Sequence, residues 1–202
     1  MDAIAPKKKI TKISNDISES DALKAVETLI KWAGDNPNRE GLKDTPKRVV
    51  NAYKEFFSGY NEDPKKILSK TFDDVKGYED IVMLKDIDLH SHCEHHMVPI
   101  IGKVHIAYLP NKKVVGISKI ARIVDVFSKR LQTQETMTTL ICNTIQDNLK
   151  PKGVAVYIEA FHQCMTTRGV NKPNVSTITT SFTGSFKNEN RLEKKFFSLL
   201  NK

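Results

Sequence analysis

The sequence predicts an α+β fold: an antiparallel four-stranded sheet with helices on one face, preceded by N-terminal helices. Two observations lead to this fold class. Four stretches show the period-two alternation or the β-branched composition of strands, and in five others apolar residues recur every three or four positions. Their order is two helices, then strand, strand, helix, helix, strand, strand, and a last helix. This order is typical of α+β domains.

The strands are predicted from alternation and from composition. Val104, Ile106 and Tyr108 alternate with polar or small residues, and a threonine-rich segment near the end of the chain favours a last strand. The four predicted strands are residues 81–89, 101–109, 154–161 and 175–186.

Local end signals place the helices. Ser20 precedes the first, whose apolar stripe stops before Gly34. Thr45 and Pro46 begin the second, as N-cap and first helical residue. Ser118 is predicted to cap the third. The last two helices are expected at 133–149 and 189–200.

Composition divides the chain into three parts. Residues 1–17 hold four lysines and few apolar residues, which is typical of a disordered basic tail. Residues 18–78 are expected to be an N-terminal helical region that ends in an irregular, charged connection. Residues 79–202 then form the sheet-containing domain, which we expect to be catalytic.

The net charge of +8 over 202 residues invites a nucleic-acid interpretation. Much of the excess lies in the tail and in residues 103–130, directly after a histidine-rich segment, where it suits an anionic small molecule. We therefore expect no nucleic-acid partner. No apolar run approaches the ~18 residues of a membrane helix, and no secretory signal opens the chain, so we expect no membrane association. Three cysteines, an odd number, favour reduced thiols in the cytoplasm over disulfides.

The histidine-rich segment predicts a metal site. Four of the six histidines and one of the three cysteines lie within residues 90–96. Cys93 and His96 are three apart, so on a helical turn they point the same way. A thiolate and an imidazole are half of a zinc site, and Cys164 completes it if the third strand ends beside this turn. Three protein ligands leave a fourth position for water, as in catalytic zinc sites.

The other histidines and cysteines are interpreted separately. His162 is two residues from Cys164 on a strand, so both share a face and His162 lies beside the metal. Its residue pattern leaves open whether it transfers protons or is a polar member of the core. His90 and His92 fall outside the ligand spacing and are interpreted as surface residues. Cys142, in an apolar helical stretch, is interpreted as a buried packing residue.

A candidate anion site adjoins the third helix. Lys119 and Arg122 lie in its first turn behind Ser118, where cations oppose the helix dipole unless an anion binds there. Arg168, four residues after Cys164, reaches the same neighbourhood if the strand exits there. A solvated basic face is an equally weighted alternative.

Several separated strings share the order of one known family and span roughly residues 18–200. They are Asn36–Leu42, Asp44–Val49, Cys93–His96, Gly116–Arg122, Gln134–Glu135, His162–Cys164 and Thr167–Gly169. In these strings the chain resembles the GTP cyclohydrolase I family. The resemblance implies a T-fold core, ββααββ, assembled as a homodecamer of two stacked five-membered rings with active sites between subunits.

The resemblance also implies a reaction. GTP would be hydrolysed at C8 with loss of formate, and its ribose carbons rebuilt into the pterin ring of 7,8-dihydroneopterin triphosphate, the first step of folate and pterin synthesis. Cys93, His96 and Cys164 would hold zinc, whose water would become hydroxide near neutral pH and add to C8. His162 would protonate N7 as a general acid, and His95 would assist proton transfer.

The remaining implied roles concern GTP recognition. Glu135 would accept hydrogen bonds from guanine N1 and N2, and Gln134 would add backbone or side-chain contacts. Ser118 would lie by the ribose. Asn51 stands where many bacterial members of the family carry a lysine. This difference affects how much the second helix would contribute to triphosphate binding, and it does not affect the chemistry. The triphosphate would bind Lys119, Arg122, Arg168 and, from another subunit, Arg48.

Two alternatives to this function stay open. One is a relative on the same T-fold with other chemistry, such as a pterin synthase or a nitrile reductase. The other is a basic, zinc-containing nucleic-acid-binding module. The predicted ligand trio together with Glu135 favours the cyclohydrolase. The sequence lacks the paired C-x-x-C knuckles and aromatic-rich basic strands that favour nucleic-acid binding.

Overall fold

The computed structural model describes residues 16–72 and 77–202, so most of the predicted basic tail at 1–17 lies outside the described residues. The chain divides into two compact units between Lys54 and Glu55. The sheet and its helices belong to the second unit. The predicted division near residue 78 into a helical region and a catalytic domain stays a prediction.

The first unit contains α1 (Glu19–Trp32), the 3₁₀ turn η1 (Glu40–Leu42) and most of α2 (Thr45–Phe56). The Ser18 hydroxyl accepts from the Asp21 N–H at 3.1 Å and the Asp21 carboxylate accepts from the Ser18 N–H at 3.3 Å. This capping box begins the helix two residues earlier than predicted. The second helix begins at Thr45, one residue before Pro46, which was predicted as its first residue.

The second unit is built on a sheet with the strand order β5-β2-β3-β6-β7. Its four long strands pair antiparallel, which confirms the predicted fold class, and β5 adds a two-residue parallel strand beside the end of β2. The strands are β2 (Val82–Cys93), β3 (Pro99–Leu109), β5 (Leu131–Gln132), β6 (Gly153–His162) and β7 (Ser176–Phe182). Shorter elements of this unit are η2 (Ser58–Asn61), α3 (Pro64–Leu68), α6 (Gln163–Thr166) and the separate pair β1 (Thr71–Phe72) and β4 (Val114–Val115).

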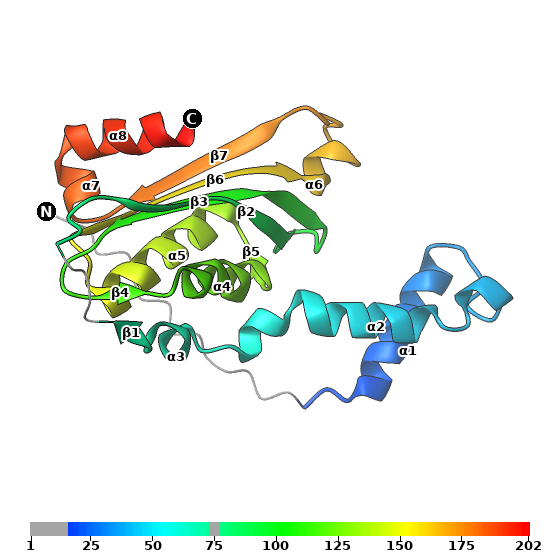
Figure 1. Cartoon of the computed structure of the whole chain (residues 1–202). Coiled ribbons are helices and arrows are strands. Elements are labelled where there is room, and N and C mark those ends of the chain that lie inside the picture. The colour runs from blue at the N-terminus through cyan, green and yellow to red at the C-terminus, as the bar shows by residue number, and fades with distance from the viewer. Residues whose placement is uncertain (1–15, 73–76) are drawn as a thin grey trace, which may run out of the picture. The chain divides into compact units, whose positions relative to one another are not determined.

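Two helices cover one face of this sheet, α4 (Ile117–Ser128) and α5 (Gln134–Leu149) (Figure 1). Between them and the strands lies the larger hydrophobic core. Its fully buried members include Val104, Ile106, Ile120, Ile123, Met137, Ile141, Ile145, Val156 and Ile158. This layer is the predicted one, because both helices repeat apolar residues at helical spacing and the strands alternate.

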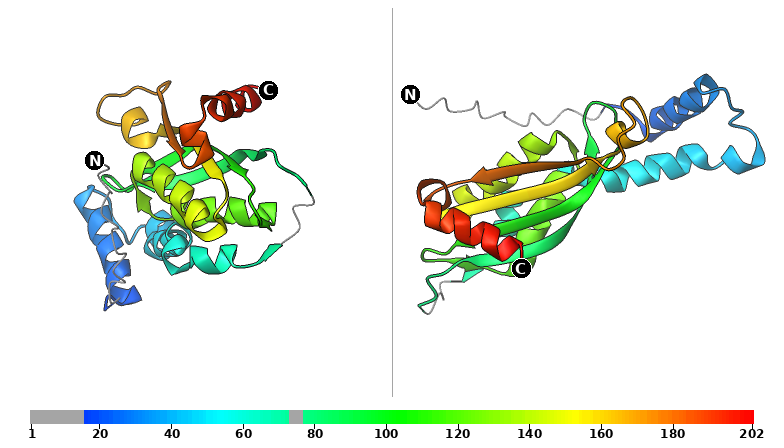
Figure 2. Two further views of the ribbon diagram at one scale, coloured as in Figure 1. Left: turned by 90° about the vertical axis from the view of Figure 1, so that its left-hand side faces the viewer. Right: turned by 90° about the horizontal axis from the view of Figure 1, so that it is seen from above.

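The C-terminal helices lie on the opposite face, α7 (Ser185–Asn188) and α8 (Asn190–Leu200) (Figure 2). Phe186, Leu192 and Phe196 are buried there against Ala107 and Ala155. The prediction that helices occupy one face therefore holds for α4 and α5 and not for α8. The physical reason is that α4 and α5 already fill the first face, so the apolar stripe of α8 packs on the other.

A β-bulge interrupts the pairing of β2 with β3. Leu84 pairs with Ile106, and the next pair is Ile87 with Val104, so β2 carries one extra residue. Within the bulge, Asp86 has φ +57° and its N–H donates to Nδ1 of the buried His105 at 3.2 Å. The side chains on both sides of the bulge consequently face the larger core.

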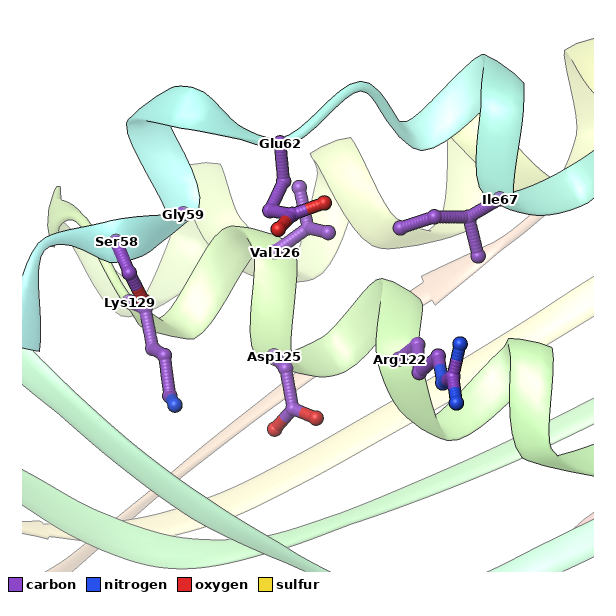
Figure 3. A pocket seen from close by; sticks show the side chains of 8 residues that line it. All are labelled: Ser58, Gly59, Glu62, Ile67, Arg122, Asp125, Val126 and Lys129. Carbon is purple, nitrogen blue, oxygen red and sulfur yellow. The ribbon is translucent and has the colours of Figure 1, made fainter. Parts of the chain in front are cut away.

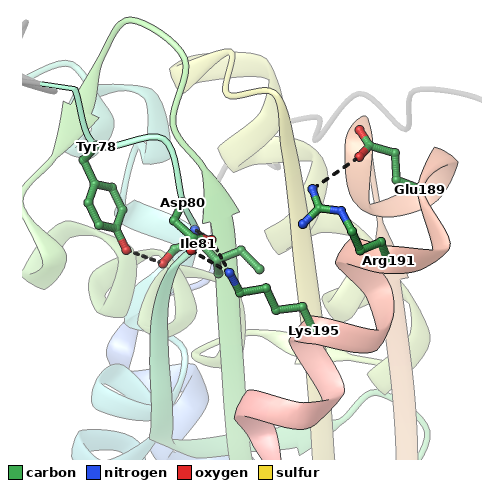
Figure 4. A network of polar contacts seen from close by, with 6 residues as sticks. All are labelled: Tyr78, Asp80, Ile81, Glu189, Arg191 and Lys195. Carbon is green, nitrogen blue, oxygen red and sulfur yellow. Dashed lines mark hydrogen bonds and ion pairs between the residues drawn. The ribbon is translucent and has the colours of Figure 1, made fainter.

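Polar contacts also join α8 to the start of β2 (Figure 4). Lys195 Nζ lies 2.7 Å from Oδ1 and 2.5 Å from Oδ2 of Asp80. The Tyr78 hydroxyl donates to the Ile81 carbonyl at 2.9 Å. Because exposed ion pairs contribute about 0–1 kcal/mol, burial of the α8 aromatics is the main attachment of this helix. Across the described residues, none of the helices combines the length and the apolar character needed to cross a membrane.

Candidate metal centre and active site

Adjacent strand ends bring the three predicted metal ligands together. Cys93 is the last residue of β2, His96 lies in the turn that follows, and Cys164 lies in α6 directly after β6. Strand β3 lies between β2 and β6, so these ends are neighbours. The candidate ligand atoms of the three residues all lie within 4.8 Å of one another. The proximity that the sequence argument required is therefore present in a single chain.

The turn that carries His96 is fixed by backbone hydrogen bonds. The Met97 N–H donates to the Cys93 carbonyl at 2.8 Å, and the Cys93 N–H donates to the Val98 carbonyl at 2.9 Å. Met97 has φ +55°, which is uncommon for a residue with a side chain. This closed turn holds the Cys93 thiol and the His96 ring on the same side.

The donor set fits zinc. Two sulfurs and one imidazole nitrogen are ligands that zinc accepts, and tetrahedral bonds of ~2.3 Å to sulfur and ~2.0 Å to nitrogen separate the donors by about 3.6 Å. Cys93 Sγ lies 3.9 Å from Nδ1 of His96. Burial raises the pKa of the Cys164 thiol, and the nearby Cys93 raises it further. A divalent cation would favour both thiolates and reverse that effect.

His162 ends β6 and lies beside α5. Its Nε2 is 2.8 Å from the side-chain oxygen of Gln134, the first residue of α5. Burial lowers the pKa of His162, and the carboxylate of Glu135 acts in the opposite direction. The strand end thus places His162 two residues from the candidate ligand Cys164 and in contact with a buried amide.

Gln134 is 1% exposed, although it was predicted to contact guanine. Its side-chain nitrogen donates to the carbonyls of Ile158 and Thr177 at 3.2 and 2.9 Å, and to the Thr179 hydroxyl at 3.1 Å. The side chain therefore points into the protein. A backbone or a side-chain contact to guanine was predicted for Gln134, and only the backbone contact is compatible with this conformation.

Two further residues predicted for chemistry and recognition lie beside these groups. Nδ1 of His95 is 3.7 Å from Cys93 Sγ, and its Nε2 is 3.9 Å from the Glu94 carboxylate. Glu135 follows Gln134 at the start of α5 and is exposed. Its carboxylate is therefore available to a ligand in the single chain.

The predicted phosphate-binding cations are not all in one place. Arg168 lies at the metal end, with Nη1 2.7 Å from Nε2 of His96. Lys119 lies in the first turn of α4, whose other end leads to β5 and Cys93. Arg122, predicted for the same turn, is the sixth of the 12 residues and lies at the middle of the helix. At 1.5 Å per residue, Lys119 is about 13 Å along the helix from that other end. Along α4, the single chain therefore separates Lys119 from the candidate metal ligands, with Arg122 part-way between.

Arg122 faces a hollow of about 270 Å³ between α4 and the η2–α3 segment (Figure 3). Lys129 lines it as well, together with the acidic Glu62 and Asp125.

Ser118 was predicted to be the N-cap of α4. The N-cap is Gly116 instead, and Ser118 is an exposed residue of the first helical turn. That part of the prediction was wrong, since glycine also serves at N-caps.

The remaining predictions have mixed outcomes. Arg48 is exposed in the first unit, 3.4 Å from the carboxylate of Asp44. Cys142 is fully buried, which confirms its interpretation as a packing residue. His92 is 7% exposed and its ring stacks on Phe56 with centroids 4.6 Å apart, so its interpretation as a surface residue was wrong. His90 is exposed, as predicted.

Comparisons with known proteins agree with this geometry. The sequence model of the family described as GTP cyclohydrolase I matches residues 22–201. The chain belongs to the GTP cyclohydrolase I family. Among its relatives, the GTP cyclohydrolase 1 of Maricaulis maris is 60% identical over 202 residues, 99% of this chain and 98% of that protein. The GTP cyclohydrolase 1 of Hyphomonas neptunium is 60% identical over 201 residues, which cover 98% of this chain and 98% of that protein. The GTP cyclohydrolase 1 of Brucella anthropi is 56% identical over 190 residues, which cover 94% of this chain and 89% of that protein.

A solved structure, the apo form of the archaeosine synthase QueF-Like, matches 52% of this chain and 93% of its own. Its TM-score is 0.43 and its sequence identity is 18%, too low to support an inference.

What sequence reasoning missed in this member of the GTP cyclohydrolase I family is the role of β7. Thr177 and Thr179 hold the Gln134 amide, whereas the threonine-rich composition was interpreted only as strand propensity.

Proposed function

We propose that this chain hydrolyses GTP at C8, releases formate and forms 7,8-dihydroneopterin triphosphate. Membership of the GTP cyclohydrolase I family supports the activity. The observation that carries the assignment of the site is the convergence of Cys93, His96 and Cys164 beside His162. In this arrangement a metal ligand set and a proton donor lie at the same end of the sheet.

We propose that Cys93, His96 and Cys164 hold zinc. Zinc bound there would lower the pKa of a water molecule toward neutrality, which is the chemistry that attack on C8 requires. Thiolate ligands also need a reducing compartment, and all three cysteines are free thiols. This supports the cytoplasm as the place where the protein acts.

His162 is the proposed general acid. It would donate a proton to N7 of guanine as C8 is attacked, and it lies within two residues of the ligand Cys164. His95 lies beside Cys93 and would move a further proton. Its exposed side chain gives it access to solvent, which a group that exchanges protons needs.

Recognition is divided between the base and the triphosphate. The exposed carboxylate of Glu135 would accept from guanine N1–H and the 2-amino group, a donor pair that adenine lacks. Gln134 would add a backbone contact to guanine, and Ser118 would lie by the ribose. The triphosphate would bind Lys119, Arg122, Arg168 and Arg48.

We propose that the active site is shared between copies in a homodecamer of two pentameric rings. The support is the distance of about 13 Å along α4 between Lys119 and the end of the helix that leads to Cys93. If a neighbouring copy presents its α4 to this metal end, base and triphosphate can be bound together. Sharing of this kind would also cover Glu135, which is exposed in the single chain.

The activity test is incubation of the purified, zinc-loaded protein with GTP. Formate should appear in about equal amounts to GTP consumed, and oxidation of the product should give a fluorescent pterin. The control is His162→Ala, which should retain bound zinc and turn over GTP at a greatly reduced but measurable rate. A protein that binds zinc and leaves GTP unchanged would exclude the proposed reaction.

The assembly test uses two inactive proteins. One carries Cys164→Ser and the other Lys119→Ala with Arg122→Ala. If a site takes its metal ligands and its cations from different copies, co-assembly of equal amounts should restore activity to about one quarter of the parent value. No recovery in co-assembled particles would place both groups on one copy. Light scattering should give the mass of a decamer, and a fully active monomer would contradict the proposal.

A further inference from the structure

The orientation of the Gln134 amide is determined by its surroundings. Its nitrogen faces two backbone carbonyls, those of Ile158 and Thr177. If the amide were rotated by half a turn, its oxygen would face those carbonyl oxygens, and neither has a hydrogen to donate. The nitrogen therefore lies on the strand side and the oxygen faces His162 at 2.8 Å.

This orientation determines the tautomer of His162. The Gln134 oxygen can only accept, so Nε2 of His162 must carry the hydrogen of the 2.8 Å contact. We propose that Gln134 is a positioning residue that fixes the ring orientation of His162 and keeps its Nε2 protonated. The inference rests on the proposed function, because it gives this pair a purpose in the transfer of a proton to guanine.

The chemical consequence concerns the other ring nitrogen. With Nε2–H held by the amide oxygen, Nδ1 is the nitrogen that exchanges a proton with the substrate. In the imidazolium form both nitrogens carry hydrogen, and the one on Nδ1 goes to guanine N7 while Nε2–H stays in place. In the described part of the chain, Nδ1 of His162 has no hydrogen-bonding partner.

Burial makes Gln134 a rigid support. Its side chain is 1% exposed and has hydrogen bonds at both ends, and α5 begins at this residue. Thr179, one of its acceptors, is also 2.7 Å from the Thr138 hydroxyl, one turn further along α5. Strands β6 and β7 thus hold the amide nitrogen directly, and α5 holds Thr179 through Thr138. Breaking one contact would leave a buried polar group unpaired, which is unfavourable.

The kinetic test is a double-mutant cycle on GTP turnover. Gln134→Met keeps the approximate shape and removes the acceptor, so kcat should fall by about 100-fold while KM changes by less than about threefold. In a His162→Ala background the same change should cost less than about threefold, because Gln134 acts through that ring. Cys142→Ala is the matched control, a buried residue of α5 that contacts β7 and not His162. It should leave kcat unchanged.

A second measurement is independent of turnover. Solid-state NMR of the assembled protein with ¹⁵N-labelled histidine reports the tautomer, and His162→Asn identifies the His162 signals. The parent should show Nε2–H, and Gln134→Met a mixture of tautomers. If Gln134→Met does not fold, Gln134→Asn, which keeps the amide one methylene shorter, replaces it with the same expectations.

The outcomes separate the inference from the proposed function. No GTP turnover by the parent overturns the function, whatever the tautomer. If the parent turns over GTP and the kcat losses of Gln134→Met and His162→Ala add up in the double variant, the inference alone is overturned. An Nδ1–H tautomer of His162 in the parent has the same consequence. A KM increase with altered preference between GTP and inosine triphosphate would show that Gln134 contacts guanine instead, and would also overturn it.

Discussion

The two faces of the sheet bury different kinds of side chain. Under α4 and α5, polar residues such as Gln132, Gln134 and Thr138 lie in the core with their hydrogen bonds made. Under α8 the buried cluster is mainly apolar, with Phe186 and Phe196 completely covered and the buried His105 as a polar exception. Buried polar groups are costly unless their geometry is fixed, so they occur where positions matter. The α4–α5 face therefore carries the chemistry, and the α8 face contributes mainly stability.

The largest expected difference between the faces comes from Cys164→Ser at the edge of the α4–α5 face. Bound zinc should fall from about one per chain to a small fraction, because serine is a poor zinc ligand. GTP turnover should fall by at least about 1000-fold, since the activated water is lost. Metal analysis and the formate assay measure both. Full turnover in rigorously metal-free parent protein would contradict this expectation.

On the α8 face, Phe196→Ala should affect stability instead. Removing a fully buried phenylalanine costs about 3–5 kcal/mol of unfolding free energy. Urea unfolding measures the loss, and kcat per folded chain should stay near the parent value. The comparison between the faces would fail if kcat fell as far as it does in Cys164→Ser.

Within the α4–α5 layer, base and phosphate recognition should separate. Lys119→Ala or Arg122→Ala each removes a charge-assisted contact of about 1.5–3 kcal/mol, so GTP should bind roughly 10- to 100-fold more weakly while the preference for guanine persists. Glu135→Ala should reduce the preference for GTP over ATP and inosine triphosphate. Competition binding with these three nucleotides measures both effects. Unchanged base preference in Glu135→Ala would remove that residue from guanine recognition.

The smallest expected effect concerns His105, on the α8 face. Burial lowers its pKa, so the folded chain binds a proton less readily than the unfolded chain, whose histidines titrate near ~6.5. Stability should therefore fall as pH drops from neutrality through about 6.5 toward the lower folded-state pKa. His105→Asn keeps an acceptor for Asp86 and should lose less melting temperature between pH 7 and 5, by on the order of 1 °C. An equal loss in both proteins would contradict the prediction.

Much of this molecule could be predicted from sequence, because periodicity encodes which face of an element is buried. The strands, α5 and the common direction of Cys93 and His96 follow from spacing, and Cys164 joins them on the condition that the third strand ends beside their turn, as it does. The contact between Gln134 and His162 does not, because the two residues are 28 positions apart and only the sheet order makes them neighbours. Glycine as the cap of α4 and the burial of His92 were missed for a related reason. Local propensity does not report the surroundings that a residue meets in three dimensions.

The bulge at Asp86 has a consequence for how the chain tolerates changes in length. Val82 and Leu84 before it, and Ile87 and Leu89 after it, all pack toward the same core only because one residue is extra. Deleting that residue would turn the side chain of every later residue in β2 to the opposite face of the sheet. This includes Cys93, about 23 Å further along the strand. The thiol would then emerge on the side away from its partners. An insertion or deletion between residues 86 and 93 therefore keeps Cys93 on the side of its partners only when an even number of residues is added or removed.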